Sequence, residues 1–183
     1  MNYLKIEHED VCNGSGLRCT IWFTSCSHMC KGCFNKETWD PDSGIPFDEL
    51  AKQEIFNELS KNYISGITLS GGDPLHENNL SEVLSLVKEI RNLFPNKTIW
   101  LYTGYTWEEI RNAFGKSKEW LQSRWKDSAI NRWEIISMCD VIVDGEYIDD
   151  QRDITLKWRG SSNQRVIDVQ KSLEQGKVVL YCD

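Results

Sequence analysis

The sequence has no apolar run long enough to cross a bilayer, and its N-terminus lacks a basic start followed by an apolar stretch. We therefore expect no membrane span, no signal peptide and a cytoplasmic location. Basic residues are fewer than acidic ones, 21 against 28, and the formal net charge is −7. This argues against nucleic acid as a partner, because nucleic-acid binders normally carry a basic face. Internal repeats are missing, and the length predicts one domain over residues 1–183.

Cysteine is present in an odd number, seven, and three of the seven fall within eight residues. These three stand in the segment Cys26-Ser-His-Met-Cys30-Lys-Gly-Cys33. In a reducing compartment, close cysteine clusters bind metal more often than they form disulfides. The remaining cysteines stand alone and are expected to behave as small apolar residues. They are Cys12, Cys19, Cys139 and Cys182.

The cysteine cluster lacks a fourth cysteine nearby. Structural zinc sites and ferredoxin-type 4Fe-4S clusters normally take four protein ligands. Three thiolates would leave one iron without a protein ligand. A catalytic cluster needs such an open iron if a substrate is to bind the metal. The spacing also allows two other interpretations, a zinc site completed by His28, Cys139 or Cys182, or simply buried free thiols.

Hydrophobic periodicity predicts strands that alternate with helices. Strands are expected at residues 18–24, 66–70, 98–102 and 141–143, and helices at about 47–61, 80–94 and 115–136. The capping box from Thr106 to Glu109 predicts a further helix start. Residues 1–17 show no clear periodicity, and the tail predicts two short strands, 166–169 and 178–181, around Gly176.

This alternation predicts a mainly parallel sheet in an α/β fold. Ligands of such sheets bind beyond the carboxyl ends of the strands. Three segments of chemical interest follow predicted strands there: the cysteine loop, the turn Gly71-Gly72-Asp73-Pro74, and Asp144-Gly145. Their common position strengthens the prediction of one site.

The cysteine loop followed by the Gly-Gly-Asp-Pro turn resembles the radical S-adenosylmethionine superfamily. More narrowly, the chain resembles the activating enzymes of anaerobic (class III) ribonucleoside-triphosphate reductases. The resemblance extends from residue 13 to residue 164 and is carried by six stretches. They are 13–18, 26–39, 70–76, 100–105, 141–145 and 158–164.

The resemblance implies a partial (β/α) barrel of the radical S-adenosylmethionine type. It implies a 4Fe-4S cluster on Cys26, Cys30 and Cys33, with S-adenosylmethionine bound at its open iron. Reductive cleavage of that cofactor yields a 5′-deoxyadenosyl radical, which takes a hydrogen from a glycine of the reductase. The implied partners are therefore the large component of anaerobic ribonucleoside-triphosphate reductase and an electron donor such as a flavodoxin or ferredoxin.

The resemblance also assigns the other site residues. The turn Gly71-Gly72-Asp73 would meet the amino group of S-adenosylmethionine, because glycine lets backbone approach a ligand closely and a carboxylate suits an ammonium. Ser70 is a further candidate at the strand end. Asp144 could accept from ribose hydroxyls, and Arg159 could pair with a carboxylate of the cofactor or of the partner. Each assignment has a plainer alternative: residues 71–74 could form an ordinary strand-to-helix turn, Asp144 could be an exposed turn aspartate, and Arg159 could be a solvated arginine.

Two departures from the family pattern limit what is carried over. Residues 115–135 resemble a helical insertion, followed later by a C-terminal extension at 166–183. Related activases often have lysine two residues after the strand-end aspartate, where this chain has Glu146. Three rival functions also stay open at this point: activation of another glycyl-radical enzyme, radical chemistry on a free metabolite, and a zinc-binding module without catalysis.

Overall fold

The computed structural model describes residues 1–116 and 125–182, and within them the strands form one sheet of seven. Its order is β3-β1-β2-β4-β5-β6-β7. The four central strands β2, β4, β5 and β6 run parallel, whereas β1, β3 and β7 pair antiparallel at the two sides. The bounds are β1 Asn2–Asp10, β2 Leu17–Phe23, β3 Ile45–Pro46, β4 Ile64–Gly71, β5 Thr98–Tyr102, β6 Val141–Asp144 and β7 Arg165–Asp168.

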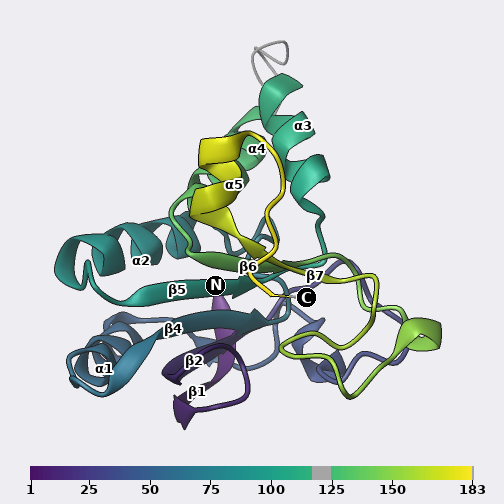
Figure 1. Ribbon diagram of the computed structural model, residues 1–183. Helices are drawn as coiled ribbons and strands as arrows, with labels where there is room; N and C mark the ends of the chain where they lie inside the picture. The colour runs from purple at the N-terminus through teal and green to yellow at the C-terminus, as the bar shows by residue number, and fades with distance from the viewer. Residues whose placement is uncertain (117–124, 183) are drawn as a thin grey trace.

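Helices connect the central strands, as the alternation predicts. They are α1 Glu49–Leu59, α2 Leu80–Leu93, α3 Trp107–Lys116, α4 Trp125–Ser137 and α5 Val169–Gln175, with short 3-10 turns η1 Lys36–Thr38 and η2 Asp149–Gln151. The predicted capping box exists: Thr106 and Glu109 exchange side-chain to backbone bonds, at 2.7 and 3.3 Å. Figure 1 shows α1 and α2 on one side of the molecule and α3 to α5 above the sheet.

One face of the sheet packs against the helices and carries the main core. Alternate strand residues such as Ile21, Leu69 and Leu101 meet Ile55 of α1 and Val87 of α2, all fully buried. The opposite face is more polar and aromatic, with a second small cluster around Trp100. The central strands all end at the edge of the sheet from which the segments 24–44 and 145–164 extend, so this edge positions the chemistry.

Two sequence predictions about the ends of the chain are wrong. Residues 2–10 form β1, which pairs with β2 from Tyr3 to Asp10. Two register shifts interrupt this pairing, and they remove the regular alternation by which a strand is recognised. In the tail, β7 leads into α5 and not into a hairpin: Asp168 caps the helix and Gly176, at φ 68°, ends it. Only a single bridge, Ile167 to Leu180, remains of the second predicted strand.

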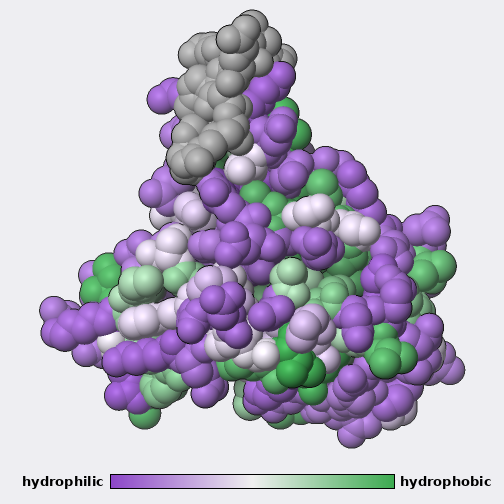
Figure 2. All heavy atoms as spheres, turned by 180° about the vertical axis from the view of Figure 1, so that it is seen from behind, coloured by the Kyte–Doolittle hydropathy of each residue, from purple (hydrophilic) through white to green (hydrophobic). Residues whose placement is uncertain are grey.

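The surface of the molecule is mainly polar, as expected when the apolar residues are buried in the core. On the face seen in Figure 2, hydrophilic residues cover most of the molecule and hydrophobic ones gather in separate patches. None of the helices in the described part of the chain has the length and apolar character that crossing a membrane requires.

Candidate functional site

The cysteine loop leaves the carboxyl end of β2 and carries three half-buried thiols within eight residues. Each cysteine follows a residue with left-handed backbone: Ser25 at φ 71° before Cys26, Met29 at 49° before Cys30, and Gly32 at 79° before Cys33. Such a conformation is uncommon for serine and methionine and is typical of functional loops. These three left-handed positions therefore fix the path of the backbone directly before each cysteine.

Two further contacts fit the loop to a thiolate-bound cluster. The Asn35 N–H donates to Cys33 Sγ at 3.4 Å, and hydrogen bonds to ligand sulfurs help to set a cluster's potential. In the protein alone, burial, with a smaller contribution from Asp73, raises the pKa of Cys26 to about 11. Burial also raises the pKa of Cys30. Metal binding must therefore displace protons from these thiols.

Three of the four lone cysteines lie away from the cysteine loop. Cys19 and Cys139 are fully buried in the main core, and Cys182 packs against the Trp100 cluster. These three therefore behave as the small apolar residues that were expected, whereas Cys12 is exposed. Among the described residues, no three His, Cys, Asp or Glu side chains converge as ligands of a single metal ion.

The Gly71-Gly72 turn lies directly against the start of the cysteine loop. Gly72 donates its N–H to Phe23 O at 2.8 Å, and Asp73 donates to Ser25 O at 2.9 Å. A Cβ at Gly72 would lie 2.6 Å from Ser25 O, which is backbone and cannot step aside. The glycines therefore permit a close approach of two protein segments, and the N–H groups of Gly72 and Asp73 hold the end of β2 and the start of the cysteine loop to the end of β4.

The Asp73 carboxylate is buried and already engaged by the protein. Its Oδ1 accepts from Leu75 N at 2.8 Å, and its Oδ2 accepts from Thr103 Oγ1 at 3.0 Å and from Gly104 N at 3.1 Å. His28 Nε2 also lies 3.0 Å from Oδ2, although it is poorly aligned for a hydrogen bond. Asp73 thus joins the ends of β4 and β5 to the cysteine loop.

Asp144, at the end of β6, is also buried and saturated. It accepts from Trp107 N at 2.8 Å and from Arg165 at 3.0 and 2.5 Å. Arg165 reaches on to Glu108 with bonds of 3.1 and 2.6 Å, and these two carboxylates raise the pKa of Arg165. Asp144 therefore fastens the end of β6 to the start of α3 and to β7.

Ser70 and Arg159 line a cavity of about 370 Å³ on the sheet face opposite the helices. Arg159 uses one donor, to Gln164 O at 2.8 Å, and the part of the chain that the structure describes gives it no carboxylate within ion-pair distance. Cys33 borders the same cavity, which brings one thiol beside both residues. The other walls come from Cys12, Asn13, Trp22, Phe34, Asn35, Tyr102, Tyr147, Trp158, Gly160 and Gln164.

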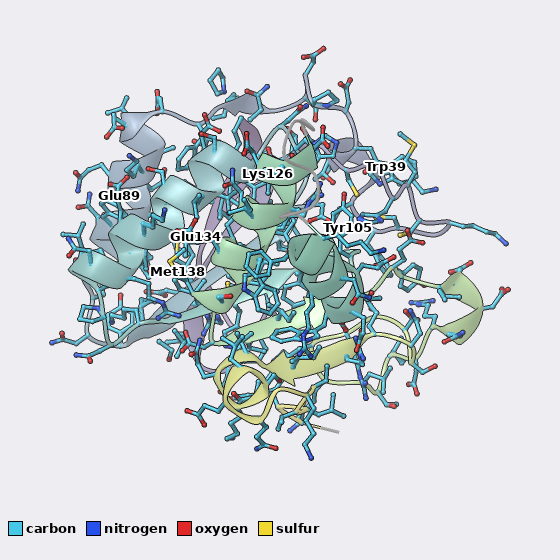
Figure 3. The ribbon with its side chains drawn as sticks, turned by 90° about the horizontal axis from the view of Figure 1, so that it is seen from above. Trp39, Glu89, Tyr105, Lys126, Glu134 and Met138 are labelled. Carbon is cyan, nitrogen blue, oxygen red and sulfur yellow. The ribbon has the colours of Figure 1, made fainter. Side chains whose placement is uncertain are left out.

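Several residues that build this site were not singled out from the sequence. Thr103 and Gly104, which bind Asp73, lie in the stretch 100–105 that contributes to the resemblance, so a signal existed. Arg165 carried no signal, because one arginine at the start of a short strand is unremarkable. The sequence indicates His28 only as a residue that could complete a zinc site. Figure 3 labels Tyr105, whose ring lies 4.7 Å from that of His28.

Comparison with known proteins defines the class first. Residues 12–167 match the family model described as a 4Fe-4S single cluster domain, which places the chain among iron–sulfur proteins and fits the three-thiol loop. Proteins named anaerobic ribonucleoside-triphosphate reductase-activating protein are similar over nearly their whole length. The one from Escherichia coli K12 is 40% identical over 91% of this chain and 97% of its own.

The similarity to activating proteins extends beyond one group of organisms. The relative from Pasteurella multocida is 39% identical over 90% of this chain and 95% of its own, and that of enterobacteria phage T4 is 38% identical over 91% and 93%. The chain belongs to the family of anaerobic ribonucleoside-triphosphate reductase-activating proteins.

Proposed function

We propose that this chain is a glycyl-radical activase, which cleaves S-adenosylmethionine reductively at a 4Fe-4S cluster and takes a hydrogen from a glycine of anaerobic ribonucleoside-triphosphate reductase. The observation that carries the proposal is the loop of three half-buried cysteines at the carboxyl edge of a parallel sheet, in a chain of this family. When bound, the cluster and S-adenosylmethionine supply the electron transfer and the 5′-deoxyadenosyl radical.

Cys26, Cys30 and Cys33 hold the cluster in this proposal. Three cysteines leave one iron for the cofactor, and the left-handed residue before each cysteine fixes the backbone of the loop. His28, Cys139 and Cys182 do not complete a zinc site, because both cysteines are packed in cores and the imidazole faces two carboxylates.

The residues of the Gly-Gly-Asp turn bind the cofactor's ammonium through backbone carbonyls of Gly71 and Gly72. Asp73 contributes its negative charge from behind the turn, since its oxygens are occupied by protein donors. Asp144 holds the end of β6 in place for the ribose. Ser70 and Arg159 act from the cavity wall, where the guanidinium suits a carboxylate.

The reductase segment that carries the glycine enters beside the same cavity. Phe34 follows Cys33, lines the cavity and stays 77% exposed. It is held by the ring of Tyr147, 6.5 Å away, and by the Arg152 guanidinium at 5.5 Å. Exposed aromatics that their neighbours hold in place are characteristic contact points of protein partners. A low-potential carrier such as a flavodoxin or ferredoxin supplies the electron.

At the level of architecture, the proposal makes the sheet a partial (β/α) barrel of the radical S-adenosylmethionine type. The polar face with the 370 Å³ cavity would then be the inside of the barrel. The whole chain, 1–183, acts as one unit, with 115–135 as a helical insertion and 166–183 as an extension. Residues 117–124 of that insertion lie outside the described residues.

The test combines the reduced protein, S-adenosylmethionine and the cognate reductase without air, followed by electron paramagnetic resonance. A doublet glycyl signal is expected, and it should vanish when the target glycine of the reductase is replaced by alanine. Cofactor cleavage without that signal would refute the activase proposal and would favour a free metabolite as the substrate. Protein that binds no iron would refute the cluster as well.

A further inference from the structure

Besides its three cysteines, the cysteine loop carries a histidine whose side chain contacts the rest of the site. His28 lies between Cys26 and Cys30 and is only 10% exposed. Its Nδ1 is 2.8 Å from Glu146 Oε1, and its Nε2 is 3.0 Å from Asp73 Oδ2. Its ring stands edge-on to Tyr105, with centroids 4.7 Å apart. One imidazole therefore contacts groups that follow β4, β5 and β6.

The socket around the imidazole is shaped for it. Gly104, directly before Tyr105 at the end of β5, has no Cβ, and one placed there would lie 2.6 Å from His28 Cγ. Gly104 also donates its N–H to the same Asp73 oxygen that faces the imidazole. The absence of a side chain at 104 thus has a local explanation: it makes room for the ring of residue 28.

The loop after β6 supplies the acceptor for the other imidazole nitrogen. The Glu146 carboxylate accepts a hydrogen bond from His28 Nδ1, and Asn163 Nδ2 fixes the backbone of Glu146 by donating to its carbonyl oxygen at 2.8 Å. In this chain the loop after β6 is consequently joined to the cysteine loop.

We propose that His28 is a positioning residue, which fixes the cysteine loop, and hence the open iron of the cluster, relative to the Gly71–Asp73 turn that binds S-adenosylmethionine. The inference rests on the proposed function, because it assumes that the three cysteines hold the cluster. The imidazole makes no bond to the cofactor in this role. It sets the distance between the two parts of the site, and a cofactor that binds both parts at once depends on that distance.

The test uses anaerobically reconstituted full-length protein and the variant His28→Ala. The measurements are iron content, the electron paramagnetic resonance spectrum of the reduced cluster with and without S-adenosylmethionine, and the dissociation constant of S-adenosylmethionine. We expect iron close to the wild-type content, a changed spectral response to S-adenosylmethionine, and binding weakened about tenfold or more, because the cofactor can no longer meet both parts of the site at the right distance. The variant His28→Gln keeps one polar contact, so its dissociation constant for S-adenosylmethionine should lie between those of wild type and His28→Ala.

The matched control is His8→Ala. His8 is also held between two carboxylates, Glu54 at 2.7 Å and Glu58 at 3.1 Å, but these belong to α1, and His8 lies on β1 beside the first half of β2, away from the carboxyl end where the cysteine loop begins. The His8→Ala variant should bind S-adenosylmethionine with the affinity of wild type. Because His28→Ala could fail to fold, Gly104→Ala gives a second test: it keeps every ligand and His28 itself, but its methyl group displaces the ring.

The outcomes separate the two proposals. Weakened binding and an altered spectral response in both His28→Ala and Gly104→Ala, with iron retained in at least one of them, support the positioning role. Wild-type affinity and spectra in either variant overturn it, as does an equal effect of His8→Ala. Loss of iron from both variants would also overturn it, since His28 would then be needed to hold the cluster itself. Wild-type protein that binds no iron would refute the proposed function first.

Discussion

The arginine that joins β7 to the end of β6 offers a quantitative test of the site's framework. In Arg165→Gln, the Asp144 carboxylate, 1% exposed, keeps only the Trp107 N–H as a charge-stabilising donor. Removing one partner of a fully buried ion pair costs about 3–5 kcal/mol. Arg165 itself is 31% exposed, so water recovers part of this loss, and we expect about 2–3 kcal/mol. For a chain of this size, the melting temperature should fall by roughly 4–12 °C.

The measurement is thermal unfolding of the metal-free protein, with a double-mutant cycle. Asp144→Asn removes the buried charge, so adding Arg165→Gln to it should cost less than about 1 kcal/mol. The control is Lys88→Gln, which breaks the exposed pair between Lys88 and Glu134 of α4 (Figure 3) and should cost at most about 1 kcal/mol. A melting temperature of Arg165→Gln within 1–2 °C of that control, or additive effects in the cycle, would refute the reasoning.

The same contact predicts a pH dependence of known sign. Arg165 lowers the pKa of Glu108 below its ordinary value of 4.5. Because the folded-state pKa is the lower one, the unfolded chain binds more protons between the two values, and stability falls with decreasing pH. The stabilisation by Glu108 is complete above about pH 4.5 and disappears as the pH passes below its folded-state pKa. The difference in melting temperature between wild type and Arg165→Gln should therefore narrow in acid.

Four shorter predictions concern the cluster and the partner. Cys30→Ala should lose the cluster absorbance and cofactor cleavage, and Cys182→Ala should keep both; an active Cys30→Ala would exclude the ligand set. Gly72→Ala should lower the melting temperature by roughly 3–10 °C, since overpacking against backbone costs about 1–3 kcal/mol. Phe34→Ala should raise the KM for the reductase severalfold, whereas Leu50→Ala, 79% exposed on α1, should not. Air should bleach the visible absorption within minutes; a colour stable for hours would contradict an open iron.

The sequence predicts the central strands and their helices because each has a strong local pattern. The stripe of α2 and the apolar runs of β4, β5 and β6 are buried where the periodicity indicates. The sequence does not predict β1, because two register shifts interrupt the alternation of its residues and because the strand lies near the edge of the sheet, beside β2. The error at α5 is different in kind. Asp168 and Gly176 are a helix cap and a helix end, but seven residues between two valine-rich segments resemble a hairpin equally well.

For the site, the sequence identifies which residues gather at the strand ends but cannot say what occupies their oxygens. The partners of Asp73 and Asp144 stand far away in the chain: Thr103 is 30 residues from Asp73, and Arg165 is 21 from Asp144. Only the folded sheet brings them together. In the folded chain, both acidic groups that the resemblance assigns to the cofactor accept hydrogen bonds from protein donors. In our proposal, the groups that face the ligand are less visible in a sequence: backbone carbonyls of a glycine turn, Ser70, and the guanidinium of Arg159.

This division of roles has a physical reason. A carboxylate buried at a strand end costs several kcal/mol unless donors surround it, and donors fixed by the protein are present whether or not the cofactor is bound. Asp73 can therefore hold β4, β5 and His28 together in the empty protein, so that the cofactor meets a site already assembled. These donors pair the buried Asp73 carboxylate before any cofactor binds. Asp73→Asn should consequently destabilise the metal-free protein, and not only weaken its affinity for S-adenosylmethionine.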